Sequence, residues 1–175
     1  VGALLGIVEV PEKGIQEPLH YGVRQSGLQI IGSSAETRGL LASLIVQYAL
    51  GGHDVYCVSG DYHSLRGLRQ MLDDLKVTPA ALIGPDDPEF LCYVIKSFQQ
   101  QCSSDSALFV CDALDTWMEQ NIREAAAQNI LCELFASAES PSVNVIATAQ
   151  KTLRGKLSQY FNTTLRSARS VSQDP

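Results

Sequence analysis

Apolar runs typical of buried strands alternate with helical segments along most of this chain. The runs Leu28–Gly32, Ala107–Cys111 and Val143–Ala147 lack polar alternation, which is typical of strands covered on both faces. Residues 38–50 and 64–75 instead repeat apolar side chains at spacings of three and four, as amphipathic helices do. Because strands and helices alternate in this way, the sequence predicts an α/β fold with a mainly parallel central sheet and helices on both faces.

The remaining predicted elements fit the same alternation. A strand over Leu4–Val10 should end at Pro11, which cannot donate to a ladder. The other expected elements are strands over Asp54–Ser59, Ala80–Ile83 and Thr163–Val171 (an edge strand) and helices over Pro88–Phe98 and Trp117–Ala136. At 175 residues the chain fits one domain with a sizeable core. It begins at Val1, close to an apolar run, so we expect that it was cut from a longer protein.

Charge is distributed unevenly along the chain. The formal net charge is −6, which disfavours general nucleic-acid binding. From Lys151 onward there are five basic residues and one acid, whereas the first 150 residues carry 8 bases and 18 acids. The basic segment Lys151–Arg169 is therefore a candidate docking surface for a neighbouring domain, and a solvated tail is the equally weighted alternative.

Cysteine and histidine usage favours neither a metal site nor a disulfide framework. The five cysteines are odd in number, lack C-x-x-C spacing, and in several cases fall inside apolar elements. This pattern is typical of reduced structural thiols in a reducing compartment. His20, His53 and His63 are scattered near expected turns or element ends, so we expect no metal site. The sequence shows no signal peptide, and no apolar run approaches the ~18 residues of a membrane span.

The segment Leu28–Gly39 (LQIIGSSAETRG) has the context of a phosphate-binding loop without its residues. A P-loop reads G-x-x-x-x-G-K-[ST] between a buried strand and a helix. Gly32 holds the first glycine, but the other three required positions hold Thr37, Arg38 and Gly39. Thr37 is β-branched where the chain must turn tightly, Arg38 is a broad fork where a slim ammonium must reach phosphate, and Gly39 has no hydroxyl for Mg²⁺. The sequence predicts a strand–loop–helix frame that no longer hydrolyses nucleotide.

Two further positions fit a nucleotide-hydrolase pattern. Leu108–Ala113 (LFVCDA) has the form of a Walker B strand, in which Asp112 would hold Mg²⁺ and a following glutamate would polarise water. The glutamate position holds Ala113, and Asp115 is better explained as the cap of the helix expected from Trp117. Gln150 follows the strand VNVIATA, where such folds carry a γ-phosphate sensor, although an ordinary strand-end polar residue explains it more simply.

Two other groups have both a functional and a structural interpretation. Asp61 and His63 suggest acid–base chemistry, but a turn followed by a helix cap at Ser64 explains them more simply. Trp117 begins an apolar stripe that fits core packing, and an exposed Trp117 would instead be part of a recognition pocket.

Several segments follow one another in an order that resembles a known family. GIVEVPEKGIQEPLHYGV (residues 6–23) precedes the first buried strand, GLQIIGSSAETRG stands at the Walker A position, and VSGDYHSLRG, LFVCDALD and VNVIATAQ follow. Each motif is loose, and their order and spacing carry the comparison. Together they resemble FtsK/SpoIIIE-type ATPase domains, and more narrowly the repeated ATPase modules of the type VII secretion motor, the EccC/EssC group. The resemblance covers residues 4–150.

The resemblance implies a RecA-like, P-loop NTPase-type three-layer fold in one degenerate ATPase domain. The implied vestigial nucleotide-binding positions are Gly32, Ser33, Thr37, Arg38, Gly39, Asp112 and Gln150. It implies no catalytic residue, metal or cofactor here, with ATP and Mg²⁺ bound by sister domains. The implied partners are sister ATPase domains of the same chain and small secreted helical substrate proteins, without nucleic acid. The domain would lie on the cytoplasmic side of a protein anchored in the cell membrane through its other parts, with a role in recognition and inter-domain regulation.

Two alternatives stay open at the level of sequence. The first is a divergent, active NTPase that uses Arg38 as its phosphate ligand. The second is a DNA translocase module, as the FtsK relationship alone would suggest, although the acidic body of the chain argues against it.

Overall fold

Six parallel strands form the central sheet of this computed structural model, which describes residues 3–10, 12–21, 27–85, 88–101, 107–120, 133 and 143–167. The strands are β3 (Leu28–Ile31), β4 (Val55–Ser59), β5 (Ala81–Ile83), β6 (Ala107–Asp112), β7 (Val143–Ala149) and β8 (Thr163–Arg166). Their order across the sheet is β5-β4-β6-β7-β3-β8, and each neighbouring pair is parallel. The carboxyl ends of β3, β6 and β7 therefore lie along one edge, where parallel sheets bind ligands.

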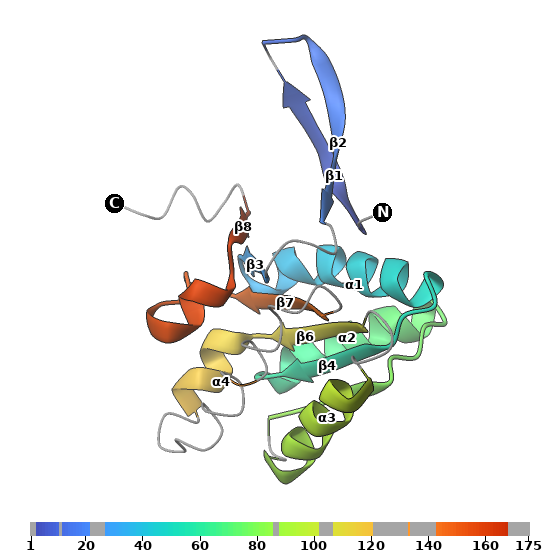
Figure 1. Cartoon of the computed structure of the whole chain (residues 1–175), viewed down its shortest axis with the longest axis vertical. Coiled ribbons are helices and arrows are strands. Elements are labelled where there is room, and N and C mark those ends of the chain that lie inside the picture. Colours follow the sequence, from blue (N-terminus) through green and yellow to red (C-terminus); the bar gives the residue numbers. More distant parts are fainter. Residues whose placement is uncertain are drawn as a thin grey trace.

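Helices cover both faces of this sheet, as the sequence predicts (Figure 1). The helices α1 (Ser34–Leu50) and α2 (Tyr62–Asp74) bury Leu44 and Leu68 against one face. The helices α3 (Pro88–Gln101) and α4 (Leu114–Gln120) bury Phe98 and Trp117 against the other. Successive strand residues alternate between the two clusters because side chains in a strand point to opposite faces. The expected three-layer α/β architecture is confirmed.

A second, two-stranded sheet projects from this body (Figure 1). The strands β1 (Ala3–Val10) and β2 (Ile15–Tyr21) pair antiparallel, and the turn between them contains Gly14 at a φ of 60°. Its base is held by the buried Tyr21, whose hydroxyl donates to the Val145 carbonyl oxygen at 3.3 Å. The Gln47 side chain of α1 also bonds to both the N–H and the carbonyl oxygen of Leu4. The sequence predicted β1 but not β2.

Several element boundaries differ from those expected. Helix α1 begins at Ser34, four residues before the predicted start, and α2 begins at Tyr62 rather than Ser64. Strand β7 continues through Ala149. The helix expected over residues 117–136 begins at Leu114; residues 121–132 and 134–142 lie outside the described residues. The predicted edge strand is confirmed as β8, which ends at Arg166, and residues 168–171 of that prediction are not among those described.

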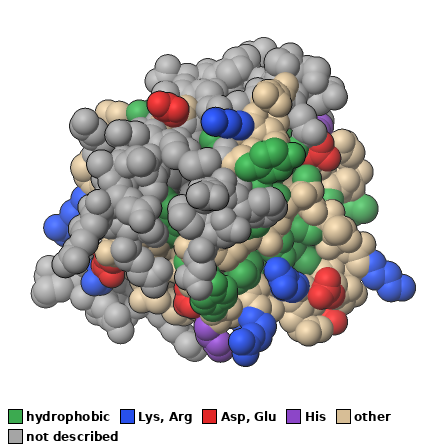
Figure 2. Space-filling model, turned by 90° about the horizontal axis from the view of Figure 1, so that it is seen from below, with side chains coloured by type: hydrophobic (Ala, Val, Ile, Leu, Met, Phe, Trp, Pro, Cys, Tyr) green, Lys and Arg blue, Asp and Glu red, His purple; other side chains and the backbone are tan. Residues whose placement is uncertain are grey.

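The surface shown in Figure 2 carries Lys and Arg side chains interspersed with Asp and Glu. Charge of one sign therefore does not dominate the described part of this face. None of the described helices has the length and apolar content needed to cross a bilayer.

Candidate functional site

The turn after β3, where the sequence suggested a degenerate phosphate-binding loop, is only two residues long. Gly32 and Ser33 connect β3 to α1, which begins at Ser34. A P-loop with its first glycine at Gly32 would remain a loop as far as residue 37. Thr37 is instead buried within α1, where its Oγ1 donates to the Ser33 carbonyl oxygen at 3.2 Å. The loop of the expected strand–loop–helix frame is therefore absent here, because its residues have become helix.

Four backbone amides of this segment have partners inside the chain. The N–H groups of Glu36 and Thr37 donate to the Ser33 carbonyl oxygen at 2.9 and 3.0 Å, and the Gly32 N–H donates to the Ala149 carbonyl oxygen at 3.0 Å. The Glu36 carboxylate accepts from the Ser33 N–H and hydroxyl, both at 2.9 Å. A negative group of the protein itself thus lies at the helix terminus, the place where a phosphate would otherwise bind. The sequence carries a signal for this arrangement, since Ser33 and Glu36 have the S-x-x-E spacing of a capping box.

Arg38 is directed toward α2 and not toward the edge of the sheet. A Cβ atom placed on Gly67 of α2 would lie only 2.3 Å from Arg38 Cζ and 2.5 Å from its Nη1. The guanidinium therefore packs directly on the glycine surface of the neighbouring helix. Arg38 Nε is buried and has no hydrogen-bond partner among the described residues. Gly39 lies exposed in the same helix, so neither residue occupies the position that the P-loop pattern assigned to it.

Asp112, the Walker B position, has both carboxylate oxygens occupied by hydroxyl donors. It is 3 % exposed and accepts from Ser59 Oγ and from Thr148 Oγ1, both at 2.7 Å. Thr148 Oγ1 also accepts from the Ala113 N–H at 2.8 Å. Ala113 has a φ of 51°, which is the left-handed region that non-glycine residues rarely adopt. Asp112 therefore ties together the ends of β4, β6 and β7. Sequence analysis missed Ser59 and Thr148, although each lies near the carboxyl end of a strand beside β6.

Asp115 has a different partner from the one expected. It lies in the first turn of α4, and so does not cap a helix that starts at Trp117. Its Oδ2 accepts from the backbone N–H groups of Gln150 and Lys151 at 2.9 and 3.2 Å, and its Oδ1 accepts from the Thr116 N–H at 3.0 Å. Asp115 therefore fixes the segment that follows β7, an interaction between residues 35 positions apart that spacing does not reveal.

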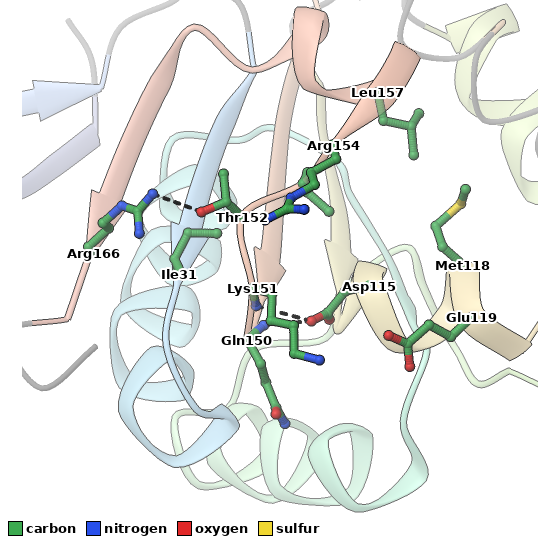
Figure 3. A pocket seen from close by; sticks show the side chains of 11 residues that line it. Ile31, Asp115, Met118, Glu119, Gln150, Lys151, Thr152, Arg154, Leu157 and Arg166 are labelled. Carbon is green, nitrogen blue, oxygen red and sulfur yellow. Dashed lines mark hydrogen bonds between the residues drawn. The ribbon is translucent and has the colours of Figure 1, made fainter. Parts of the chain in front are cut away.

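Beside this segment lies a cavity of about 740 Å³ (Figure 3). It is bounded by the end of β3, by α4, by residues 150–154, by the 3₁₀ helix η1 (Gly155–Tyr160) and by β8. Its apolar lining comes from Ile31, Met118, Leu153 and Leu157, and its charged and polar lining from Asp115, Glu119, Gln150, Lys151, Thr152, Arg154 and Arg166. Gln150 and part of the basic segment Lys151–Arg169 thus line one cavity; Arg169 lies outside the described residues.

The other suggested site residues have structural roles. Asp61 caps α2 by accepting from the His63 backbone N–H at 2.8 Å, so Asp61, and not Ser64, is the cap residue. Ser64 lies buried inside α2. Trp117 is 4 % exposed and packs in the core, which corrects the alternative of an exposed recognition residue. Within the described ranges, no three His, Cys, Asp or Glu side chains gather to hold a metal ion.

Two buried cysteine thiols lie near Asp112. Cys57 and Cys111 are free, on neighbouring strands β4 and β6. Burial raises the pKa of both thiols, and the negative charge of Asp112 raises the pKa of each further. Both thiols stay protonated at neutral pH, so they are inert as nucleophiles or metal ligands in the folded protein.

No known family model and no curated protein matches this sequence. Solved structures do match the fold. EccC from Thermomonospora curvata (ATPases 2 and 3, in complex with a signal sequence peptide) has a TM-score of 0.66 at 15 % identity, covering 94 % of this chain and 35 % of that one. The cytoplasmic domain of the Thermomonospora curvata type VII secretion ATPase EccC has a TM-score of 0.67 at 16 % identity, covering 94 % and 23 %. The cytoplasmic domain of EssC has a TM-score of 0.65 at 16 % identity, covering 98 % and 38 %.

The chain thus spans well under half the length of these structures, one of which contains ATPases 2 and 3 of its protein. At sequence identities of 15–16 %, these similarities establish a shared fold and not a shared function. The protein has the α/β fold seen in the type VII secretion ATPase EccC and in the cytoplasmic domain of EssC.

Proposed function

We propose that this protein is a non-hydrolysing, ATPase-like module of a type VII secretion motor and is part of a longer chain. The fold likeness to EccC and EssC supports a place in such a motor. The module would act through contacts with sister ATPase domains and with secreted proteins, and not through its own nucleotide chemistry.

One observation carries the non-hydrolysing part of the proposal: the short turn after β3. Because α1 begins at Ser34, the backbone amides of Glu36 and Thr37 bond to the Ser33 carbonyl oxygen and are unavailable to phosphate. The Glu36 carboxylate bonded to Ser33 would in addition repel a triphosphate. A P-loop binds phosphate with several free N–H groups and a lysine, whereas here the N–H groups of Gly32, Ser33, Glu36 and Thr37 are bonded within the chain and the lysine position holds Arg38.

The Walker B region supports the same proposal. The hydroxyl groups of Ser59 and Thr148 already use both oxygens of Asp112, the group that would orient Mg²⁺. Ala113 takes the place of the glutamate and is in a left-handed conformation. Arg38, on which a divergent NTPase would depend, packs on Gly67 of α2, so we do not favour that alternative.

The proposed partners follow from the composition of the similar structures. At least one of them contains more than one ATPase, and that one is bound to a signal sequence peptide. We place ATP and Mg²⁺ in sister domains of the parent protein, and small secreted helical proteins among its partners. The module would lie on the cytoplasmic side, with membrane anchoring supplied by other parts of the parent. The interspersed charges of Figure 2 and the net charge of −6 argue against a DNA translocase.

Calorimetry and a turnover assay with Mg-ATP test the proposal. We expect no heat of binding at millimolar nucleotide, no phosphate release, and no rise in the unfolding temperature, since a ligand at 100 times its Kd would add about 2.7 kcal/mol to stability. The matched variant is Asp112→Ala. ATP hydrolysis by the native protein that is lost in Asp112→Ala would refute the proposal. ATP binding to the native protein in the low-micromolar range would refute it as well.

A further inference from the structure

The ribbon formed by β1 and β2 projects from the body, and the outer edge of β1 has no neighbouring strand among the described residues (Figure 1). We propose that this edge is a self-association site, where β1 of a second copy of the chain adds antiparallel and completes a four-stranded sheet. The edge lies apart from the turn after β3 and from the Asp112 network, so this association does not depend on the proposed absence of nucleotide chemistry.

Exposed apolar side chains are concentrated on the ribbon. Leu4, Ile7, Ile15 and Leu19 make up half of the large hydrophobic side chains that the described residues expose, and Ile7 is 69 % exposed. A sheet of only two strands is marginally stable in water, and further strands stabilise it. Clustered apolar side chains at a surface mark interaction sites. The ribbon therefore has the composition of an incomplete sheet.

Hydrogen bonds at the base of the ribbon show which residues of β1 direct their backbone groups outward. The Leu4 N–H donates to Gln47 Oε1 at 2.7 Å and the Leu4 carbonyl oxygen accepts from Gln47 Nε2 at 3.0 Å, so both groups face away from β2. Inward and outward pairs alternate along an antiparallel ladder. Because Leu4 pairs with His20, the next outward pair contains Pro18 and its partner Ile7. Pro18 agrees with this assignment, since it has no N–H to donate to β1.

The two edges of the ribbon differ in their capacity to add a strand. On β2, Pro18 lacks the outward N–H that strand addition uses, and proline is a common protection of sheet edges. On β1, Gln47 occupies the edge at Leu4. No described residue outside the ribbon bonds to the backbone of residues 6–10. These residues therefore form the free part of the β1 edge.

The free segment is self-complementary about Val8, its central residue. A two-fold axis at Val8 places Ile7 opposite Glu9 of the second copy, and Glu9 opposite Ile7 of the second copy. Ile7 and Glu9 both direct their backbone groups outward, so each pair exchanges both N–H···O bonds. Glu9 is the only charged residue of β1, and this register does not place it directly opposite its own copy. Pairing of this kind is isologous and closes a dimer.

Sedimentation equilibrium from about 10 µM to about 1 mM measures the association, and we expect a dimer with a Kd on the order of 0.1 mM. The affinity should be low because so short a pair of strands buries much less than the roughly 1,600 Å² of a standard interface. Two-dimensional NMR reports the register. The amide protons of Ile7 and Glu9 lie roughly 7 Å apart within one strand, but they become close neighbours across the dimer axis. An NOE between them should therefore grow with protein concentration.

Matched variants separate the β1 edge from general apolar association. Ile7→Pro removes an outward N–H and no bond to β2, so it should weaken the dimer at least about tenfold. Ile7→Val keeps that N–H and should leave the Kd within about threefold. Leu75→Ser, which removes an exposed apolar side chain at the end of α2, should leave the Kd unchanged.

Three outcomes would overturn the inference. The first is a native chain that stays monomeric up to about 1 mM, which would leave a strand of another protein as the occupant of this edge. The second is a dimer without the Ile7–Glu9 NOE, since it would use a different surface. The third is an equal loss of association in Ile7→Pro and Leu75→Ser. The NOE is measured on the native chain, so it decides the register even where Ile7→Pro disturbs the ribbon.

Discussion

Gly60, the residue after β4, is packed so closely that no side chain fits. Its N–H donates to the Asp112 carbonyl oxygen at 2.8 Å. A Cβ atom there would lie 2.4 Å from the Ala113 carbonyl oxygen, 2.5 Å from Trp117 Cβ and 2.7 Å from Trp117 N. Two of these three atoms belong to the backbone of the β6–α4 junction, which cannot move aside as a flexible side chain can. Because Gly60 has no side chain, the β6–α4 junction can pack closely against the end of β4, and this packing stabilises the Asp112 network.

Gly60→Ala should lower the free energy of unfolding by about 2–4 kcal/mol, because the added methyl group must push apart the β6–α4 junction. Equilibrium denaturation in urea measures the effect. Gly39→Ala is the matched control, since nothing lies within 4 Å of that Cβ position. It should raise stability by about 0.5–1 kcal/mol through helix propensity. Equal effects of the two substitutions would contradict the packing argument.

The buried thiols of Cys57 and Cys111 make stability depend on alkaline pH. Burial and the Asp112 charge raise the pKa values of both thiols above the ordinary value of 9.0. Between pH 9 and the raised pKa values, the thiols are therefore ionised in the unfolded chain and protonated in the folded protein. Their contribution is complete below pH 9 and is lost as pH rises toward the folded-state pKa values. The free energy of unfolding should therefore fall above pH 9, by at most about 1.4 kcal/mol per pH unit for each thiol.

Urea denaturation at several pH values between 8 and about 10 checks this slope before Tyr48 adds to it, because the unfolded chain ionises Tyr48 only from its ordinary pKa of 10.0 upward, while burial raises its pKa in the folded protein to about 12. The double variant Cys57→Ala/Cys111→Ala should show a smaller slope, whatever its absolute stability. An unchanged slope in that variant would mean that other groups cause the pH dependence.

At the scale of elements, the contact between α1 and α2 depends on Arg38 lying over Gly67. The guanidinium occupies the space that a Cβ of Gly67 would need. This contact explains why Arg38 points away from the edge of the sheet. It also predicts that the two positions are energetically coupled, because a change at either one alters the space available to the other.

A double-mutant cycle measures this coupling. In an Arg38→Ala background, Gly67→Ala should stabilise the protein by about 0.5–1 kcal/mol, the usual helix-propensity gain. In the native background the same substitution should bring little or no gain, because the methyl group displaces the guanidinium. Additive effects in urea denaturation would show that Arg38 does not rest on α2 in solution.

At the scale of the whole molecule, the proposed failure to bind nucleotide depends on the fold around β3 and not only on the three substituted motif residues. The triple variant Thr37→Gly/Arg38→Lys/Gly39→Thr restores the complete G-x-x-x-x-G-K-T pattern from Gly32. We expect it still to bind no Mg-ATP, because Glu36 remains at the helix terminus and both Asp112 oxygens remain bonded. It should also be less stable, since it places a glycine inside α1 at the buried Thr37.

Calorimetry on the triple variant measures binding, with the native chain as control. Micromolar affinity in the triple variant would show that the lost motif residues alone account for the lost site. That result would contradict the role assigned here to Glu36 and to the Asp112 hydrogen bonds.

The sequence by itself determined the architecture. The runs that begin at Leu28, Ala107 and Val143 form β3, β6 and β7. A continuous apolar stretch between helices is buried on both faces when it lies in the middle of a parallel sheet. The sequence also determined that α1 begins at Ser34, because Ser33 and Glu36 form hydrogen bonds with each other as a capping box. These two residues lie inside the segment that also resembles a P-loop.

Only the tertiary structure decided the site. The partners of Asp112 lie 53 and 36 residues away, the Asp115 contacts join α4 to the segment after β7, and Arg38 meets a glycine on another helix. The cavity of Figure 3 likewise collects residues from β3, α4, the segment after β7 and β8. Apolar periodicity is a short-range property that predicts which segments form helices and strands. These hydrogen bonds and close contacts form only after the helices and strands pack together. The spacing of residues along the chain therefore does not predict them.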